Sequence, residues 1–89
     1  MGYGNVVVSV GAATLILVGN QNRKSLIITN EGSTKIYIGP DSSVTSDTAI
    51  SIPATGMFTE DSGSETMYKG DVYGVSVTNS NTVRYWERT

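Results

Sequence analysis

The stretch RKSLIITNEGSTKIYIG, residues 23–39, carries the clearest strand pattern in the sequence. In its first half, Lys24–Asn30, Leu26 and Ile28 fall on one face of an extended chain and the residues between them fall on the other. The second half, Thr34–Gly39, repeats this alternation with two isoleucines on one face. A period of two residues in β-branched segments is typical of half-buried β-strands. The stretch therefore predicts two strands in succession.

A short polar segment, Asn30–Ser33, separates the two strands and contains Gly32. Two alternating segments joined by such a segment indicate a β-hairpin. The segment is longer than a two-residue primed turn, so we expect a loop of roughly three to five residues with Gly32 at positive φ.

The rest of the chain continues the same pattern of short strands and polar turns. No stretch of useful length places apolar residues at helical spacing. The sequence therefore predicts an all-β fold: one domain, residues 1–89, forming an antiparallel β-sandwich or barrel of jelly-roll-like type with about eight to nine short strands. The other expected strands are Asn5–Val10, Thr14–Val18, Thr48–Ile52, Met57–Glu60, Glu65–Lys69, Val72–Thr78 and Thr82–Glu87, with a last hairpin turn at Asn79–Asn81.

The composition excludes or disfavours the disulfides and metal sites that usually stabilise small domains. The 89 residues include no Cys and no His, so disulfides are excluded and structural zinc or haem is disfavoured. By elimination, we expect self-association to supply the additional stability that a small domain needs. The net charge of −2 and the scattered positions of the six basic residues argue against nucleic-acid binding. The apolar segments are too short to span a bilayer, and the N-terminal residues lack the positive charge of a signal peptide.

The absence of His and Cys also disfavours catalysis. Without His or Cys the chain cannot supply a Ser-His-Asp triad, a catalytic thiol or an imidazole acid–base pair, and no phosphate-binding loop is present. A Ser-Lys nucleophile at Arg23–Ser25 would lie on an ordinary strand surface. The carboxylates Glu60, Asp61, Glu65 and Asp71 leave two further alternatives, a glycosidase pair and a Ca²⁺ site, against solvated turn residues. We expect no enzyme activity, no cofactor and no metal, and favour the solvated turns.

The strand Thr14–Val18 is apolar throughout, which indicates burial on both faces or one face against a partner. We therefore name Leu15, Ile16 and Leu17 as a candidate subunit contact. A central buried strand is the alternative, and the sequence favours neither.

Tyr85 and Trp86 are adjacent in the last expected strand, so alternation places them on opposite faces. At least one of them then lies off the core side. These two residues are the candidate exposed aromatic contact, either with a neighbouring loop or subunit or with a carbohydrate.

Three motifs resemble small β-rich virion proteins of tailed bacteriophages. The first is R-x-S-L-I-I-x-N-x-G-x-x-x-I-Y-I-G, from Arg23 to Gly39; the second is V-T-x-x-x-A-I-x-I-x-x-x-G, from Val44 to Gly56. The third, Y-K-G-D-V-Y-G-V-S-V from Tyr68 to Val77, is followed by Val83–Glu87. The order of these motifs carries the resemblance, which covers most of the chain from Arg23 onward.

The resemblance implies a non-enzymatic structural protein of the virion, of the head-decoration, capsid-stabilising or head–tail accessory type. Its expected partners are further copies of itself, with a trimer favoured, and the major capsid protein or another virion protein. Its expected location is the virion, after synthesis in the host cytoplasm. The alternative function is a small module, as at a fibre or spike tip, that binds carbohydrate or a host surface.

Overall fold

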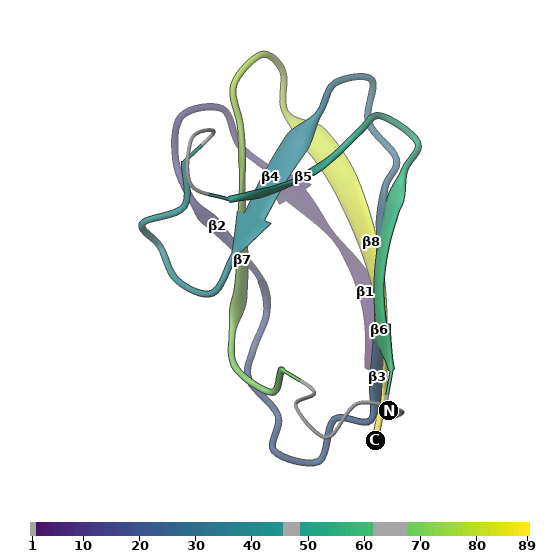
Figure 1. Cartoon of the computed structure of the whole chain (residues 1–89). Helices are drawn as coiled ribbons and strands as arrows, with labels where there is room; N and C mark the ends of the chain where they lie inside the picture. The colour runs from purple at the N-terminus through teal and green to yellow at the C-terminus, as the bar shows by residue number, and fades with distance from the viewer. Residues whose placement is uncertain (1, 46–48, 62–67) are drawn as a thin grey trace.

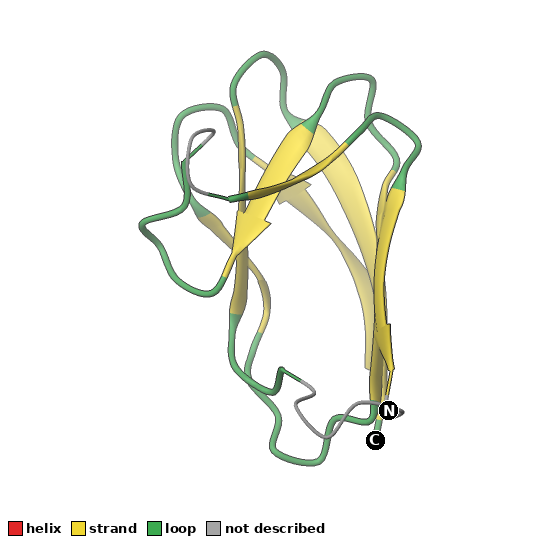
Figure 2. Cartoon of the chain, in the orientation of Figure 1, coloured by secondary structure: helices red, strands yellow, loops and turns green. Residues whose placement is uncertain are grey.

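The chain forms eight β-strands and no helix within the residues that the computed structural model describes, which are 2–45, 49–61 and 68–89 (Figure 2). Most strands follow the alternation of the sequence, with every second side chain buried. In chain order the strands are β1 (Gly2–Val8), β2 (Thr14–Leu17), β3 (Ser25–Asn30), β4 (Ile36–Gly39), β5 (Ile50–Ile52), β6 (Met57–Asp61), β7 (Val72–Ser76) and β8 (Asn81–Arg88).

The strands form two four-stranded antiparallel sheets that pack face to face (Figure 1). Sheet A has the order β1-β8-β3-β6, and sheet B has the order β2-β7-β4-β5. Strands equally far from the two ends of the series are paired: β1 with β8, β2 with β7, β3 with β6 and β4 with β5. This is the pairing of one long hairpin rolled into two layers, which is a jelly roll. The expected all-β fold is confirmed, as a sandwich rather than a closed barrel.

The predicted hairpin at residues 23–39 is wrong, although both of its strands exist. β3 lies in sheet A between β8 and β6, whereas β4 lies in sheet B between β7 and β5. The apolar faces of both strands point into the core, so the two strands oppose each other across the sandwich instead of pairing. The last predicted hairpin fails in the same way, since β7 and β8 belong to different sheets. Among the strands of the described residues, only β4 and β5 are both consecutive and paired.

Two buried asparagines hold the crossover from β3 to β4. The Asn30 side-chain amide donates to the Thr34 carbonyl at 2.8 Å, and its Oδ1 accepts from the Gly32 N–H at 2.9 Å. Asn81, at the start of β8, accepts from the Thr34 N–H at 3.1 Å. Gly32 has no positive φ, contrary to expectation. Instead, a β-carbon at Gly32 would collide with the Asn81 side chain, so close packing explains the glycine.

The core lies between the two sheets and is aliphatic. Half-buried aromatic side chains, those of Phe58, Tyr68 and Tyr85, pack against it. Its buried members come from seven of the strands and are Val8, Ile16, Leu17, Leu26, Ile28, Ile36, Ile38, Ile52, Val72 and Val83.

Candidate functional site

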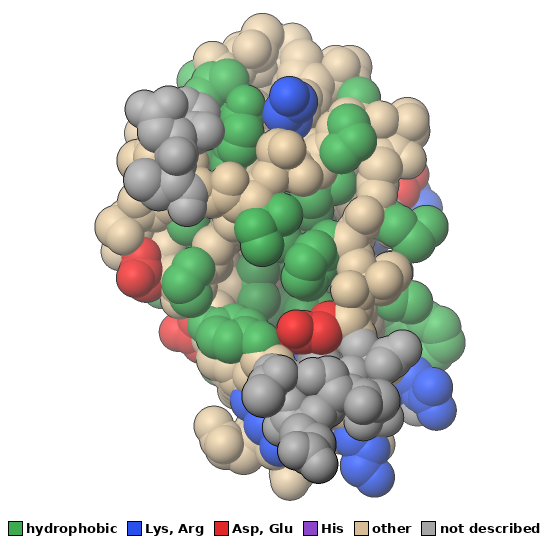
Figure 3. Space-filling model, in the orientation of Figure 1, with side chains coloured by type: hydrophobic (Ala, Val, Ile, Leu, Met, Phe, Trp, Pro, Cys, Tyr) green, Lys and Arg blue, Asp and Glu red, His purple; other side chains and the backbone are tan. Residues whose placement is uncertain are grey.

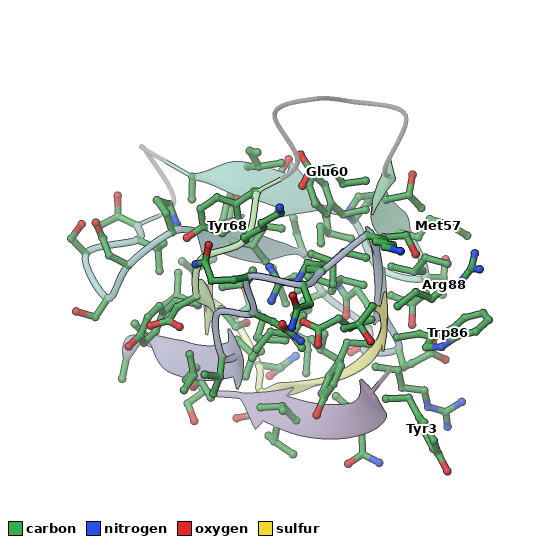
Figure 4. The ribbon with its side chains drawn as sticks, turned by 90° about the horizontal axis from the view of Figure 1, so that it is seen from below. Tyr3, Met57, Glu60, Tyr68, Trp86 and Arg88 are labelled. Carbon is green, nitrogen blue, oxygen red and sulfur yellow. The ribbon has the colours of Figure 1, made fainter. Side chains whose placement is uncertain are left out.

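The outward surface of sheet A brings together side chains from both ends of the chain. Tyr3 in β1 lies opposite Trp86 in β8, and Trp86 lies opposite Ile27 in β3. Because side chains on one face repeat every two residues, Arg84 and Arg88 share the face of Trp86. Figure 4 shows Tyr3, Trp86 and Arg88 projecting from the same side of the molecule, away from the ribbon. We call this surface, with Val7 and Met57, the outer face.

The outer face exposes large apolar side chains among polar neighbours such as Asn5, Thr59 and Thr82. Tyr3 is 82% exposed, Met57 65%, Val7 56% and Trp86 45%. Arg84 and Arg88, which share this face with Trp86, are both basic and exposed. Aromatic rings flanked by guanidinium groups are the composition that favours binding of a protein or a planar ligand.

Tyr85 and Trp86 point to opposite sides of sheet A, as their adjacency in the strand indicates. Tyr85 faces inward and packs against the core. Its ring lies beneath β1, where a β-carbon at Gly4 would come within 2.8 Å of the Tyr85 hydroxyl. The exposed member of the pair is therefore Trp86. Its neighbour on the surface is Tyr3, which the sequence could not indicate because it lies at the far end of the chain.

The strand β2 divides the residues of the candidate subunit contact between surface and core. It is an edge strand, paired only with β7 in sheet B. A register shift between Leu15 and Leu17 interrupts the alternation, so that Ile16 and Leu17 are both buried while Leu15 is 40% exposed. A β-bulge of this kind turns two successive side chains toward one side. The bulge accounts for the two successive buried residues, and the exposed apolar residues of the segment are Leu15 and Val18, which is 67% exposed.

A pocket of about 340 Å³ opens between the two sheets, at the side where β5 and β6 form neighbouring edges. Figure 3 looks into this hollow, where apolar side chains form the floor and an acidic side chain lies at the mouth. We call it the edge pocket. Its lining residues are mostly apolar: Leu26, Ile38, Gly39, Pro40, Ile50, Phe58, Glu60, Tyr68 and Val72.

Two polar residues are fixed at the edge pocket, and Figure 4 shows them near each other. The Glu60 carboxylate accepts from the Tyr68 N–H at 3.2 Å. The Tyr68 hydroxyl donates to the Asp71 carbonyl at 2.6 Å, and Gly70 leaves room for that hydroxyl because a β-carbon there would collide with it. Burial, with a smaller contribution from the Asp71 carboxylate, raises the pKa of the Tyr68 phenol above its usual value.

A buried ion pair anchors the wall of the edge pocket. Arg23 Nε donates to Glu87 Oε2 at 2.7 Å, with the Arg23 side chain fully buried. The Arg23 guanidinium also donates to the backbone carbonyls of Tyr68 and Gly70 at 3.1 Å and of Val18 at 3.0 Å. The expectation that Arg23 lies on an ordinary strand surface is wrong. The pairing of β3 with β8 places it beside Glu87, which sequence spacing does not indicate.

The acidic residues considered for catalysis or Ca²⁺ are dispersed where the structure describes them. Glu60 lies at the edge pocket, and the Asp71 carboxylate accepts from the Gly19 N–H at 2.6 Å in a different contact. Asp61 ends β6, and Glu65 lies outside the described residues. Within residues 2–45, 49–61 and 68–89, no three potential ligands gather into a metal site, and no helix could cross a bilayer.

Comparison of the chain with protein-family models, curated proteins and solved structures finds no match. The two surfaces, the outer face and the edge pocket, therefore carry the functional argument by their own chemistry. Both are suited to contact with another molecule, the outer face through its exposed rings and guanidinium groups and the edge pocket through its apolar lining.

Proposed function

We propose that this protein is a non-enzymatic structural component of a tailed-phage virion, which assembles with copies of itself through the outer face and decorates or stabilises the capsid. The observation that carries the proposal is the exposure of Tyr3, Val7, Met57 and Trp86 on one uncovered sheet surface. Tyr3 and Trp86 are cross-strand neighbours, and exposed apolar side chains that lie side by side mark an interaction site on a small soluble domain. The jelly roll adds support by analogy, since capsid domains use it, as do lectins.

The size of the domain favours a second copy as the partner. A chain of 89 residues buries only about two-thirds of its unfolded surface, and this one has no disulfide to add stability. Covering Trp86 and Tyr3 in an oligomer would remove apolar area from water at about 25 cal/mol per Å². Symmetric assembly gives each copy that stabilisation, and we expect a trimer.

Light scattering after gel filtration, across a dilution series, tests the self-association. The wild type should elute as a stable oligomer, and Trp86→Ser should elute as a monomer with an unchanged circular dichroism spectrum. Val77→Ser is the matched control, because Val77 is 55% exposed but lies outside the outer face. A wild type that stays monomeric at every concentration would contradict the proposed self-association.

The location is tested separately, by mass spectrometry of density-purified phage particles from a host that carries the gene. Peptides of this chain should co-purify with the major capsid protein in a fixed ratio. Their absence from the purified particles would remove the virion assignment and leave the oligomer to be explained otherwise.

A carbohydrate-binding module is the second candidate, and the cross-strand pair of Tyr3 and Trp86 favours it. Adjacent aromatic rings on a flat sheet can stack on sugar rings, and Arg84 and Asn5 lie next to them on the same face as hydrogen-bond donors. A glycan array with Trp86→Ala and Tyr3→Ala as controls tests it. Binding by the wild type that both variants lose would support this candidate, and no binding to any glycan would exclude it.

A further inference from the structure

The outer face and the edge pocket are unlike surfaces that complement each other. The outer face presents aromatic rings and the basic residues Arg84 and Arg88. The edge pocket presents apolar walls and the carboxylate of Glu60. The same chain therefore carries two complementary surfaces. One combines aromatic rings with cations, and the other combines apolar walls with an anion.

We infer that the edge pocket of one copy receives Trp86 and Arg88 from the outer face of the next copy. The inference rests on the self-association proposed above and names the surface that the outer face contacts. Trp86 supplies the apolar group for the pocket, and the guanidinium of Arg88, two residues along the same strand face, supplies the charge opposite Glu60.

The size and construction of the pocket fit this occupant. A volume of about 340 Å³ is at the small end of ligand pockets, which suits one aromatic side chain better than an extended ligand. Glu60 is held in place by the Tyr68 N–H at 3.2 Å. Tyr68 is in turn held through its hydroxyl by Asp71 and through its carbonyl by Arg23. The acceptor is therefore positioned before binding, which lowers the entropy lost in association.

The contact joins two different patches, so it is heterologous. However many copies are added, one end of the assembly keeps a free outer face and the other end keeps a free edge pocket. Such an interface continues until the rotation between copies closes a ring, and otherwise it gives an open filament. A face-to-face dimer, in which two outer faces cover each other, would leave the pocket empty. The two arrangements make different predictions for mixed variants.

The decisive experiment mixes two variants that are defective on opposite surfaces. Trp86→Ala removes the inserted ring, and Glu60→Arg places a cation in the pocket. Each variant alone should be monomeric by light scattering. A one-to-one mixture should form a complex of two chains and nothing larger, because only the intact pocket of the first and the intact face of the second can meet.

Two further variants separate charge from folding. Glu60→Gln keeps the acceptor for Tyr68 and should raise the dissociation constant at least about tenfold. Arg88→Glu should weaken assembly, and the double variant Glu60→Arg with Arg88→Glu should restore it. Asp41→Asn is the matched control, since Asp41 is an exposed carboxylate that belongs neither to the outer face nor to the lining of the edge pocket. Circular dichroism should show the same fold in every variant.

The outcomes distinguish this inference from the proposal on which it rests. If the wild type assembles but the Glu60 variants assemble equally well, or the two defective variants stay apart when mixed, the heterologous contact is overturned and self-association stands. Binding of tryptamine in the pocket without any change in assembly would also overturn it, in favour of a small-ligand site. A wild type that never assembles would overturn both.

Discussion

At the scale of single residues, the ends of the sandwich are closed by polar side chains that are fully hydrogen-bonded. No buried side-chain N or O atom lacks a partner among the described residues. Asn30 and Asn81 lie at one end, and Arg23 and Glu87 at the other. Buried polar groups of this kind are costly to leave unpaired. Single substitutions here should therefore cost more than their exposed counterparts.

Arg23→Met should lower the free energy of unfolding by about 3–5 kcal/mol, because it leaves the Glu87 carboxylate buried without its cation. Urea denaturation followed by circular dichroism measures the change. Arg84→Met, at an exposed site, should change stability by no more than about 0.5 kcal/mol. The double variant Arg23→Met with Glu87→Leu should lose less than the sum of the two single changes. Additive losses would mean that the pair is not coupled.

Tyr68 should make the protein sensitive to alkaline pH. Its phenol has a raised pKa in the folded state, so the protonated form favours folding. That contribution is complete below the unfolded pKa of about 10 and is lost as the pH rises through the folded pKa. As the pH rises above the unfolded pKa of about 10, the free energy of unfolding should therefore fall more steeply for the wild type than for Tyr68→Phe.

At the scale of elements, β2 shows how one strand can serve the core and the surface at once. Its bulge turns Ile16 and Leu17 inward and leaves Leu15 outside. Ile16→Ala should cost about 2–5 kcal/mol because it opens a cavity in the core. Leu15→Ala should change the free energy of unfolding by no more than about 0.5 kcal/mol in the monomer. Equal losses for the two neighbours in chemical denaturation would contradict the bulge.

The strands themselves could be predicted from sequence, but their partners could not. Alternation correctly grouped Leu26 with Ile28 and Ile36 with Ile38, and these shared faces are the buried ones, because the side chains of a strand alternate whatever strand lies beside it. The alternation does not indicate which strand is the neighbour. The hairpin at residues 23–39 assumed that consecutive strands pair, a tendency that the jelly roll overrides here at every connection except β4–β5.

The candidate site likewise has features that the local sequence indicates and features that depend on strand pairing. The adjacency of Tyr85 and Trp86 in one strand indicated that at least one of them lies off the core side, and the structure shows that this residue is Trp86. Its neighbour Tyr3 and the ion pair of Arg23 with Glu87 depend on the registers of β1 and β3 with β8. Those registers join distant parts of the chain, and no local pattern specifies them. The edge pocket likewise arises from two sheet edges, one with Ile50 and the other with Glu60.

At the scale of the whole molecule, the rolled topology predicts slow folding. Nearly all strand pairs join distant segments, and the outermost joins Gly2 to Glu87. Loop-closure entropy must be lost before such contacts form, so folding dominated by them takes milliseconds to seconds. Stopped-flow refolding from urea should therefore show its main phase in that range. A main phase completed in microseconds would contradict the pairing of β1 with β8.

The pairing of Gly2 with Glu87 also places the two ends of the chain side by side, as Figure 1 shows. The hydrogen bonds of an antiparallel ladder run across the strands. A tension applied through both ends would therefore act along these bonds and load the outermost pair first, so that β1 would peel from β8 one pair at a time. The same tension applied through the broad surfaces of the sandwich would be shared by many contacts. As a mechanical component, this domain resists load when it is gripped by its faces and yields when it is pulled by its ends.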